Sequence, residues 1–502
     1  MPSHPASDSA TPPEVVPRAV TGLVVAGAIL LGLINANVSL KADDVGSLHA
    51  VLAPWPDLIG NLSKDVHPPL YFFFLKAFVS ALGDGEWALR VFSIVCYWLG
   101  GAAMYRLARR FLPPAGAIQA AAVFLTAPLA VLSAELVRMY SMTGLLGILA
   151  ATTLVDFVRR PGWRGMAAFT GWTVLGTFTH IWFFCLLAGL GLAVLLRAPA
   201  LLWRVALGMA AGLVPYALFW LPMLWRQLEL SSEAMAWLPA PDLDMLTQTV
   251  LLWLGVSVLL LPWVIWRWRR LSAKGPEDGR EAAAWALWIL VGCILPAIAV
   301  SFYKPFFYPR FTLVAIPFVA LLVGWALWRT AGVQSAGALV ILACLMALGL
   351  RAYPENCTGR VAARQLLEHA RPGDFVIFTG LSRPAARHYL DRTRPGRNWQ
   401  EQTFPAEIDT HPGYEGRVGA PARLPGLRRE AAALADRLRQ SPPGTQLFFL
   451  EGRFPDVEAI LKQALSAPAS GARAASLQPF PVAACPADGG GYFHTISGWR
   501  VP

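Results

Sequence analysis

Two adjacent carboxylates stand at the start of the stretch "SLKADDVGSLHA", residues 39–50. They are Asp43 and Asp44, and they follow a run of about twenty apolar residues, which is long enough to cross a bilayer. Carboxylates at this place could belong to a solvated loop, bind a metal ion or take part in catalysis. The other ionisable residues near the ends of apolar runs discriminate between these alternatives.

Ionisable side chains recur beside several other apolar runs, on what the topology below predicts to be the same side of the membrane. Charged groups at the membrane boundary are costly and are functional candidates for that reason. Each one alone could equally be an interfacial residue whose charged end reaches water. As a set, however, they predict a site. Besides the acidic pair, its members are Asp65, His67, Glu135, Arg138, His180, Lys304 and Arg310.

The charges in this set are complementary. The carboxylates of Asp43, Asp44 and Glu135 can accept a proton or bind a hydroxyl group. The cations Arg138, Lys304 and Arg310 can hold an anion such as phosphate. A base beside a cationic clamp at the lipid–water boundary suits transfer of a group from a lipid phosphate to a hydroxyl acceptor. The carboxylates also allow a divalent cation, but no metal-specific spacing requires one, so no metal ligands are predicted.

The composition identifies a membrane protein. Of the 502 residues, 56% are hydrophobic and only 15% are charged, whereas soluble proteins carry about a quarter charged residues. The net charge of +11 comes largely from arginines at the ends of apolar runs. We interpret it as an orientation signal and as contact with anionic membrane lipids, and not as nucleic-acid binding.

About eleven apolar runs are long enough to cross the membrane. They cover residues 17–38, 87–108, 115–133, 140–158, 166–180, 181–197, 204–222, 246–266, 282–302, 311–328 and 332–350. The fifth and sixth are one continuous stretch that we divide at His180. As a single segment, this stretch would be longer than one membrane crossing. The arginine clusters would then also fall on alternating sides of the membrane.

The positive-inside rule orients these spans. The arginine clusters predict a multi-pass protein of the inner (plasma) membrane with a cytoplasmic N-terminus. An odd number of spans then places residues 351–502 on the periplasmic or extracytoplasmic side. The first outer loop, residues 39–86, holds the acidic pair. It also holds the apolar run 70–82, which is too short to cross and is expected to lie in the interface or to re-enter.

Two domains are predicted: a transmembrane domain over 1–350 and an extracytoplasmic domain over 351–502. In the second domain, "DFVIFTG" and "TQLFFLEG" have the pattern of buried strands. The segments "GRVAARQLLEHA", "LRREAAALADRLRQ" and "PDVEAILKQAL" have the pattern of amphipathic helices. This alternation predicts a soluble α/β fold. Cys357 and Cys485 lie in this part, where an oxidising location would permit a disulfide between them.

Five motifs in order resemble the C-type glycosyltransferases, in particular the polyprenyl-phosphate-dependent branch of protein O-mannosyltransferases and lipid A aminoarabinose transferases. The motifs are "SLKADDVGS", "DVHPPLYFFFLKAF" with "GDGEWALRVFS", "SAELVRMYSMTGLL", "FTHIWF" and "YKPFFYPRFTLVAIP". The matches extend over residues 17–350. Each motif is weak alone, but their common order is specific.

The resemblance implies a mechanism. Asp43 matches the catalytic aspartate of the family and would be the general base on an acceptor hydroxyl, with inversion at the transferred sugar. Glu135 would orient the acceptor or the sugar, while the donor phosphate would bind to Arg138, Lys304 and Arg310. The implied pocket residues are Asp65, His67, Tyr140 and His180. The donor would be a polyprenyl-phosphate sugar, and the acceptor a lipid, a glycan or a protein.

Two departures from the family pattern affect the acceptor side of this interpretation. Asp44 stands where the family usually has Glu, and Lys41-Ala42 replaces the usual aromatic residue. Arg90 is expected to pair with Glu86 at the outer face, four residues earlier in the same helix.

Two other functions remain as alternatives. A transporter or flippase of lipid-linked glycans would be expected to show repeated halves with paired broken helices, and no repeat is visible in the sequence. A scaffold whose C-terminal domain does the chemistry would need a nucleophile and base or a phosphate loop there. No such motif is apparent.

Overall fold

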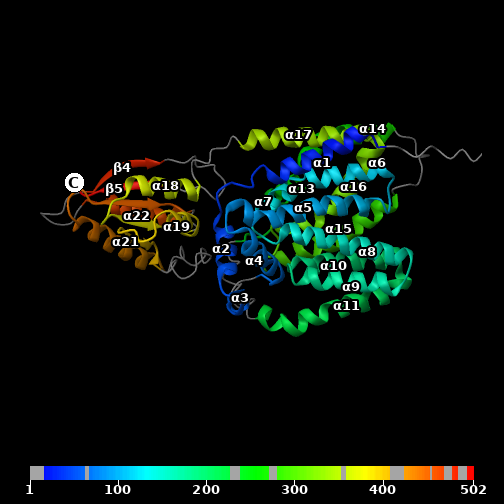
Figure 1. Ribbon diagram of the computed structural model, residues 1–502, viewed down its shortest axis with the longest axis horizontal. Helices are drawn as coiled ribbons and strands as arrows, with labels where there is room; N and C mark the ends of the chain where they lie inside the picture. The colour runs from blue at the N-terminus through cyan, green and yellow to red at the C-terminus, as the bar shows by residue number, and fades with distance from the viewer. Residues whose placement is uncertain are drawn as a thin grey trace, which may run out of the picture.

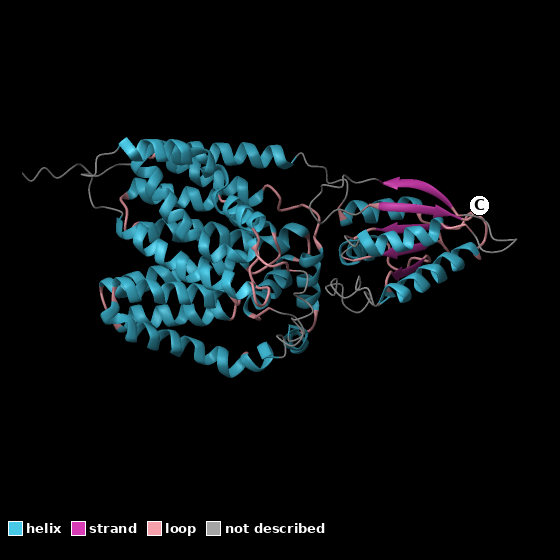
Figure 2. Cartoon of the chain, turned by 180° about the vertical axis from the view of Figure 1, so that it is seen from behind, coloured by secondary structure: helices cyan, strands magenta, loops and turns pink. Residues whose placement is uncertain are grey.

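The computed structural model describes residues 16–62, 67–225, 238–270, 280–351, 358–380, 382–406, 423–452, 455–468, 477–483 and 495–502. Figure 1 shows a helix bundle followed by a smaller region that contains a β-sheet, and Figure 2 shows the same division from behind. The helix α2 lies at the end of the bundle that faces the sheet region.

The bundle is built from helices of very different lengths. Those up to residue 201 are α1 (Arg18–Leu33), α2 (Ala42–Leu52), α3 (Trp55–Leu62), α4 (Leu70–Leu82), α5 (Glu86–Ala108), α6 (Pro114–Thr126), α7 (Pro128–Glu135), α8 (Tyr140–Arg159), α9 (Trp163–Thr177), α10 (Trp182–Arg197) and the 3-10 helix η1 (Pro199–Leu201). The later ones are α11 (Leu202–Phe219), α13 (Leu243–Leu254), η2 (Gly255–Leu260), α14 (Leu261–Arg270), α15 (Arg280–Ser301), η3 (Pro309–Ala315), α16 (Ile316–Ala331) and α17 (Gln334–Arg351).

All eleven predicted apolar runs coincide with helical segments of this bundle. Six helical stretches in the described residues are long and apolar enough to cross a membrane, and the pair α6–α7, bent by 55°, makes a seventh if it is one broken span. Three more runs form the shorter apolar helices α1, α10 and α17. The remaining run forms α9, which has 15 residues.

The long apolar stretch is broken near His180, where the sequence predicts its division. The helix α9 ends at Thr177 and α10 begins at Trp182, with a turn between them. Gly189 on α10 allows close packing against α15, because a Cβ atom there would lie 2.3 Å from the Ile289 carbonyl oxygen. Small residues of this kind are typical of close helix contacts in membrane proteins.

The first outer loop forms three short helices, α2, α3 and α4. The helix α2 packs against α4, and the Lys76 amine of α4 donates hydrogen bonds to the carbonyl oxygens of Val51, at 2.7 Å, and Ala53. These carbonyls belong to the C-terminal end of α2, where backbone acceptors lack partners within the helix and where a cation is favourable. The long lysine therefore fixes the C-terminal end of α2.

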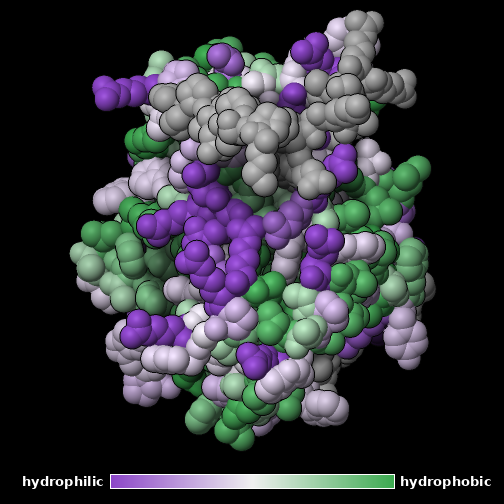
Figure 3. Space-filling view, turned by 90° about the vertical axis from the view of Figure 1, so that its right-hand side faces the viewer, coloured by the Kyte–Doolittle hydropathy of each residue, from purple (hydrophilic) through white to green (hydrophobic). Residues whose placement is uncertain are grey.

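The end of the bundle remote from the sheet region carries exposed ion pairs. Arg110, which follows α5, forms two hydrogen bonds to Asp156 of α8, at 2.5 and 2.8 Å. Arg159 of α8 pairs with Glu281 of α15 at 3.0 Å. Figure 3 views this end of the molecule and shows hydrophilic side chains gathered at its centre. The arginines of the predicted cytoplasmic connections thus join the ends of separate helices.

The C-terminal region contains a five-stranded sheet in the order β2-β1-β3-β5-β4. The strands are β1 (Phe375–Phe378), β2 (Gln400–Thr403), β3 (Gln446–Leu450), β4 (Gln478–Ala483) and β5 (Ile496–Arg500), and the helices are α18 (Gly359–His369), α19 (Ser382–Thr393), α21 (Leu424–Arg439) and α22 (Pro455–Ser466). The pairs β1–β2 and β1–β3 are parallel, whereas β5 is antiparallel to β3 and β4. The residues of β1 are all buried.

The protein has two hydrophobic cores, and one of them extends over both the helix bundle and the sheet region. A smaller core lies within the sheet region, between the sheet and helices α21 and α22. The larger core contains the bundle and also Leu366, Ala386 and Leu390 from α18 and α19. The helix α19 packs directly against α2, so one face of the sheet region is continuous with the first outer loop.

Candidate active site

The acidic pair forms the first turn of α2. Lys41 precedes the helix in an extended conformation, and its backbone N–H donates to the Asp44 carboxylate at 3.1 Å. Carboxylates in a first helical turn are stabilised by the unpaired N–H groups and the positive end of the helix dipole. Because adjacent residues of a helix are about 100° apart, the two carboxylates point in different directions and meet different partners.

Asp44 is buried in the bundle and pairs with Arg90. Its side chain is 0% exposed and accepts hydrogen bonds from the Val137 N–H at 2.9 Å and from the Arg90 guanidinium at 3.3 Å. Val137 lies between α7 and α8, and Arg90 lies in α5. Asp44 therefore connects the start of α2 to two other parts of the bundle.

Arg90 is also fully buried, and its contacts differ from the predicted ones. It forms its ion pair with Asp44 at 3.3 Å, while Glu86 pairs with Arg360 of α18 at 2.9 Å. The prediction of an Arg90–Glu86 pair is therefore wrong for the side chains. The reason is that the Arg90 guanidinium turns inward to donate to backbone carbonyls of Ala36, Val38, Ser39 and Glu135.

Asp43 is the point on which two cations converge. Its Oδ1 accepts from Arg138 Nη2 at 3.0 Å, and its Oδ2 accepts from Arg310 Nη1 at 2.9 Å. Arg138 follows α7, and Arg310 lies in η3. The Asp43 side chain is 31% exposed, and those of Arg138 and Arg310 are 12% and 25% exposed. The three groups are thus partly accessible, unlike the Asp44–Arg90 pair.

The electrostatic environment keeps Asp43 ionised. Burial would by itself raise the pKa of this carboxyl group, but the positive charges of Arg138 and Arg310, a hydrogen bond from Arg138 and the proximity of His67 lower it. The lowering dominates and holds the pKa of Asp43 well below its ordinary value.

Two histidines and two aromatic rings lie beside this cluster. The His67 and His180 rings stack with centroids 6.2 Å apart, and His180 lies 5.6 Å from Tyr140 and 5.9 Å from Phe311. His180 is buried, and its Nδ1 accepts the Trp182 N–H at 3.1 Å. In the neutral ring the proton is then on Nε2.

A backbone hydrogen bond brings the two histidine-bearing segments together. The Leu70 N–H, at the start of α4, donates to the Phe178 carbonyl oxygen at 3.0 Å, in the turn between α9 and α10. The structure therefore brings together His67, Tyr140 and His180 from the predicted pocket set. Asp65 lies outside the described residues, as do Cys357 and Cys485 and thus the predicted disulfide.

Two other predicted residues lie outside the Asp43 cluster. The Glu135 carboxylate accepts a hydrogen bond of 2.5 Å from Asn35. Lys304 is exposed, before η3, and within the described residues its amine has no hydrogen bond or ion pair. Glu135 also contributes its backbone carbonyl oxygen to Arg90.

Sequence reasoning missed the role of Arg90. The motif that contains it was recognised, but an arginine four residues after a glutamate in a helix suggests a local pair. Only the fold shows that its neighbours are the carbonyl groups that precede α2. Phe311 was also missed, although it directly follows Arg310 in a motif that was singled out.

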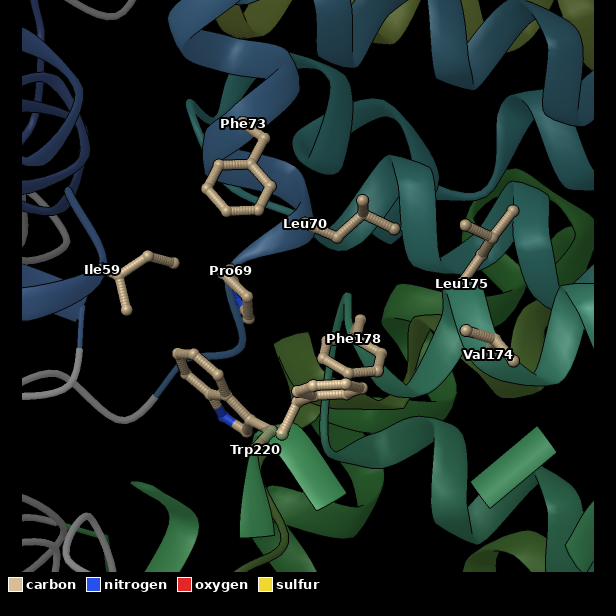
Figure 4. Close-up of a pocket in the computed structure, with 9 residues that line it drawn as sticks. Ile59, Pro69, Leu70, Phe73, Val174, Leu175, Phe178 and Trp220 are labelled. Carbon is tan, nitrogen blue, oxygen red and sulfur yellow. The ribbon is translucent and has the colours of Figure 1, made fainter. Parts of the chain in front are cut away.

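An apolar cavity of about 370 Å³ lies beside the histidines. It is lined by Ile59, Pro69, Leu70, Phe73, Val174, Leu175, Phe178, Phe219 and Trp220. Figure 4 shows side chains from α3, α4, the end of α9 and the segment after α11 around one space. Pro69 is two residues from His67, and Phe178 is two residues from His180, so the cavity lies next to the segments that carry the two histidines.

The described residues contain no group of three or more His, Cys, Asp or Glu side chains that could hold a metal ion. The four cysteines of the apolar runs, Cys96, Cys185, Cys293 and Cys344, are free thiols. The ionisable groups at the cluster are a carboxylate, two guanidinium groups and two imidazoles.

Comparison with known proteins agrees with the resemblance in the motifs. The family model described as dolichyl-phosphate-mannose-protein mannosyltransferase matches residues 66–225. A search of curated protein sequences gives no significant match.

Two solved structures share the whole fold. ArnT from Cupriavidus metallidurans bound to undecaprenyl phosphate is 12% identical, with a TM-score of 0.59 over 96% of this chain and 98% of that chain. The apo state of ArnT is 14% identical, with a TM-score of 0.56 over the same shares. The chain thus shares the fold of these structures, the C-type glycosyltransferase fold.

Proposed function

We propose that this protein is a membrane glycosyltransferase that moves a sugar from a polyprenyl-phosphate donor to a hydroxyl acceptor at the outer face of the membrane, with Asp43 as general base. The observation that carries the proposal is the convergence of Arg138 and Arg310 on Asp43, one on each carboxylate oxygen. A base and a cationic clamp for phosphate are the two components that the transfer requires.

The reaction is a single displacement. The acceptor oxygen attacks the anomeric carbon, its proton passes to Asp43, and the bond from that carbon to the phosphate oxygen breaks. The leaving group is polyprenyl phosphate, whose negative charge Arg138 and Arg310 stabilise by charge-assisted hydrogen bonds. One displacement inverts the anomeric configuration, so a β-linked donor gives an α-linked product.

The two arginines also control the basicity of Asp43. While they neutralise the carboxylate, its low pKa makes it a weak proton acceptor. A donor phosphate between Arg138 and Arg310 offers both guanidinium groups another anion. Asp43 then loses part of their stabilisation and becomes a stronger base when the donor is in place.

The surrounding residues have supporting roles in this proposal. His67, Tyr140 and His180 form the wall beside the base, where they exclude water and contact the sugar. Glu135 orients the acceptor or the sugar from the end of α7. Lys304 binds the donor phosphate from outside the Asp43 cluster, on an exposed segment ahead of η3.

The apolar cavity supports a lipid donor. Its nine lining residues are all apolar, and burial of isoprene units against them is favourable by about 25 cal/mol per Å² of apolar surface. Because the cavity adjoins His67 and His180, the first isoprene units there would hold the phosphate close to the arginines.

The proposed topology has eleven crossings, with the N-terminus cytoplasmic and residues 351–502 on the periplasmic side. This division assigns residues 1–350 to the transmembrane domain and places the acidic pair outside. Its support is that the arginine-rich connections and the acidic pair lie at opposite ends of the bundle.

The test is transfer from a defined donor. Purified protein in liposomes is given undecaprenyl phosphate carrying labelled mannose or aminoarabinose, with membranes from cells that lack the protein as the acceptor source. We expect transfer by the wild type and a loss of about 10²–10⁴-fold in Asp43→Asn, the range that general-base catalysis contributes.

Asp156→Asn is the matched control, because it makes the same change at the remote end of the bundle. It should transfer the sugar at the wild-type rate. Near-normal turnover by Asp43→Asn would refute the role of Asp43, and failure of the wild type with both donors would refute the proposed donor class.

A further inference from the structure

The segment that leads into α2 is held from two sides. From the bundle, the Arg90 guanidinium donates to the carbonyl oxygens of Val38, at 2.7 Å, and Ser39, at 3.3 Å. From the C-terminal region, contacts come from Arg360 of α18 and Tyr389 of α19. These two residues are far from α2 in the chain but meet the residues directly before its first turn.

Tyr389 supplies a partner for a backbone N–H of this segment. Its hydroxyl oxygen accepts the Leu40 N–H at 2.7 Å, in a buried hydrogen bond. The Leu40 side chain is 2% exposed and Tyr389 is 9% exposed. A buried N–H without a partner is costly, so Tyr389 favours this conformation of the segment.

Arg360 makes two further contacts to this segment and one to Glu86 at the start of α5. Its backbone N–H donates to Ser39 Oγ at 3.2 Å, and its guanidinium donates to the Asn37 carbonyl oxygen at 2.8 Å and to Glu86 at 2.9 Å. Its guanidinium also lies 5.6 Å from the centroid of the Tyr389 ring. Arg360 and Tyr389 thus act as one unit.

The apolar contacts in this area make the attachment firm. The helix α19 packs on α2, and Leu366 and Leu390 share a core with Val45 and Leu48 of α2. All four side chains are fully buried. The C-terminal region is therefore attached to the helix that carries Asp43, and not only to the end of α17.

We propose that Arg360 and Tyr389 are positioning residues for the catalytic carboxylate: they fix the start of α2 so that Asp43 meets Arg138 and Arg310. This inference rests on the proposed function for its effect on the reaction. Leu40 is three residues before Asp43, so a shift of the segment moves the first turn of α2. Arg138 and Arg310 belong to other elements and do not move with it.

The experiment compares Tyr389→Phe with the wild type in the transfer assay. The variant keeps the ring and removes only the oxygen that accepts the Leu40 N–H. We expect kcat to fall by about tenfold, because small misplacements of a catalytic group are costly. The donor KM should stay within about twofold, since the residues that bind the donor remain.

Arg392→Gln is the matched control. Arg392 also bridges the two regions, to Asp84 at 3.1 Å, but that pair is exposed and does not contact the segment before α2. The control should keep the wild-type kcat. An equal loss of kcat in both variants, or an unchanged kcat in Tyr389→Phe, would overturn the positioning role.

Hydrogen–deuterium exchange separates this inference from the proposed function. In Tyr389→Phe, amide exchange over residues 37–48 should rise at least about threefold, because an unpaired buried N–H favours opening. Arg392→Gln should leave it unchanged. Unchanged exchange in Tyr389→Phe would overturn the inference whether or not the protein accepts either donor.

Discussion

Arginine–carboxylate pairs occur at both ends of the helix bundle, and they differ in burial and in the number of elements that they join. At the remote end, the Arg110 and Asp156 side chains are 37% and 43% exposed. At the end with the acidic pair, Arg90 and Asp44 are both 0% exposed, while Asp43 is shared between two arginines at intermediate exposure. The same residue types therefore have three different roles.

The difference shows what burial does to a charged pair. Exposed pairs are screened by water and add little to stability, about 0–1 kcal/mol. A buried pair is costly to break, because the remaining charge has no solvent to replace its partner. The partly exposed Asp43 cluster lies between these limits: it is shielded enough for strong interactions and still reachable from solvent.

The largest effect on stability is expected from Arg90→Met. The substitution leaves the Asp44 carboxylate and several carbonyl groups buried without their donor, and we expect a loss of about 3–5 kcal/mol in the free energy of unfolding. Thermal unfolding of the detergent-solubilised protein would measure it. An unchanged melting temperature would show that Asp44 is not held by Arg90.

A change in the pH dependence is expected from Arg138→Gln. Without the Arg138 guanidinium, less positive charge opposes the effect of burial on Asp43. The pKa of Asp43 therefore rises. Asp43 then becomes protonated at a higher pH, and the acidic limb of the kcat/KM profile should move to higher pH than in the wild type. Arg392→Gln serves as a control without a shift. A shift to lower pH would contradict the assignment of Asp43 as the base.

The smallest effect is expected from Arg110→Gln at the remote end. The pair with Asp156 is exposed, so the unfolding free energy should change by less than about 1 kcal/mol. Sugar transfer should be unaffected because the change is far from α2. A large loss of stability or activity here would remove the distinction between the two ends.

Hydropathy located the helices of the bundle because an apolar run must be buried or face lipid wherever it lies. The break near His180 was predictable for the same reason, since a run of that length does not fit one crossing. In the C-terminal region, the buried runs around Phe375 and Leu447 form β1 and β3. The edge strand β2 has a polar sequence, "QEQT", and gave no such signal.

The members of the Asp43 cluster were predictable as residues but not as a geometry. Motifs identified Asp43, Arg138 and Arg310 as members, and these three meet in the structure. The different environments of Asp43 and Asp44 depend on which partners α5 and η3 bring to each, and no local pattern encodes that. For the same reason the motifs gave no indication that Arg360 and Tyr389 contact the start of α2.

The hydrogen bond between Leu40 and Tyr389 also has a consequence for the order in which the molecule is assembled. Its two residues are 349 positions apart, and α2, with 11 residues, is too short to be stable as an isolated helix in water. During synthesis the acidic pair emerges early, but this contact forms only after the C-terminal region has been made and folded. A loop that emerges well before the C-terminal region is therefore among the last parts of the protein to be completed.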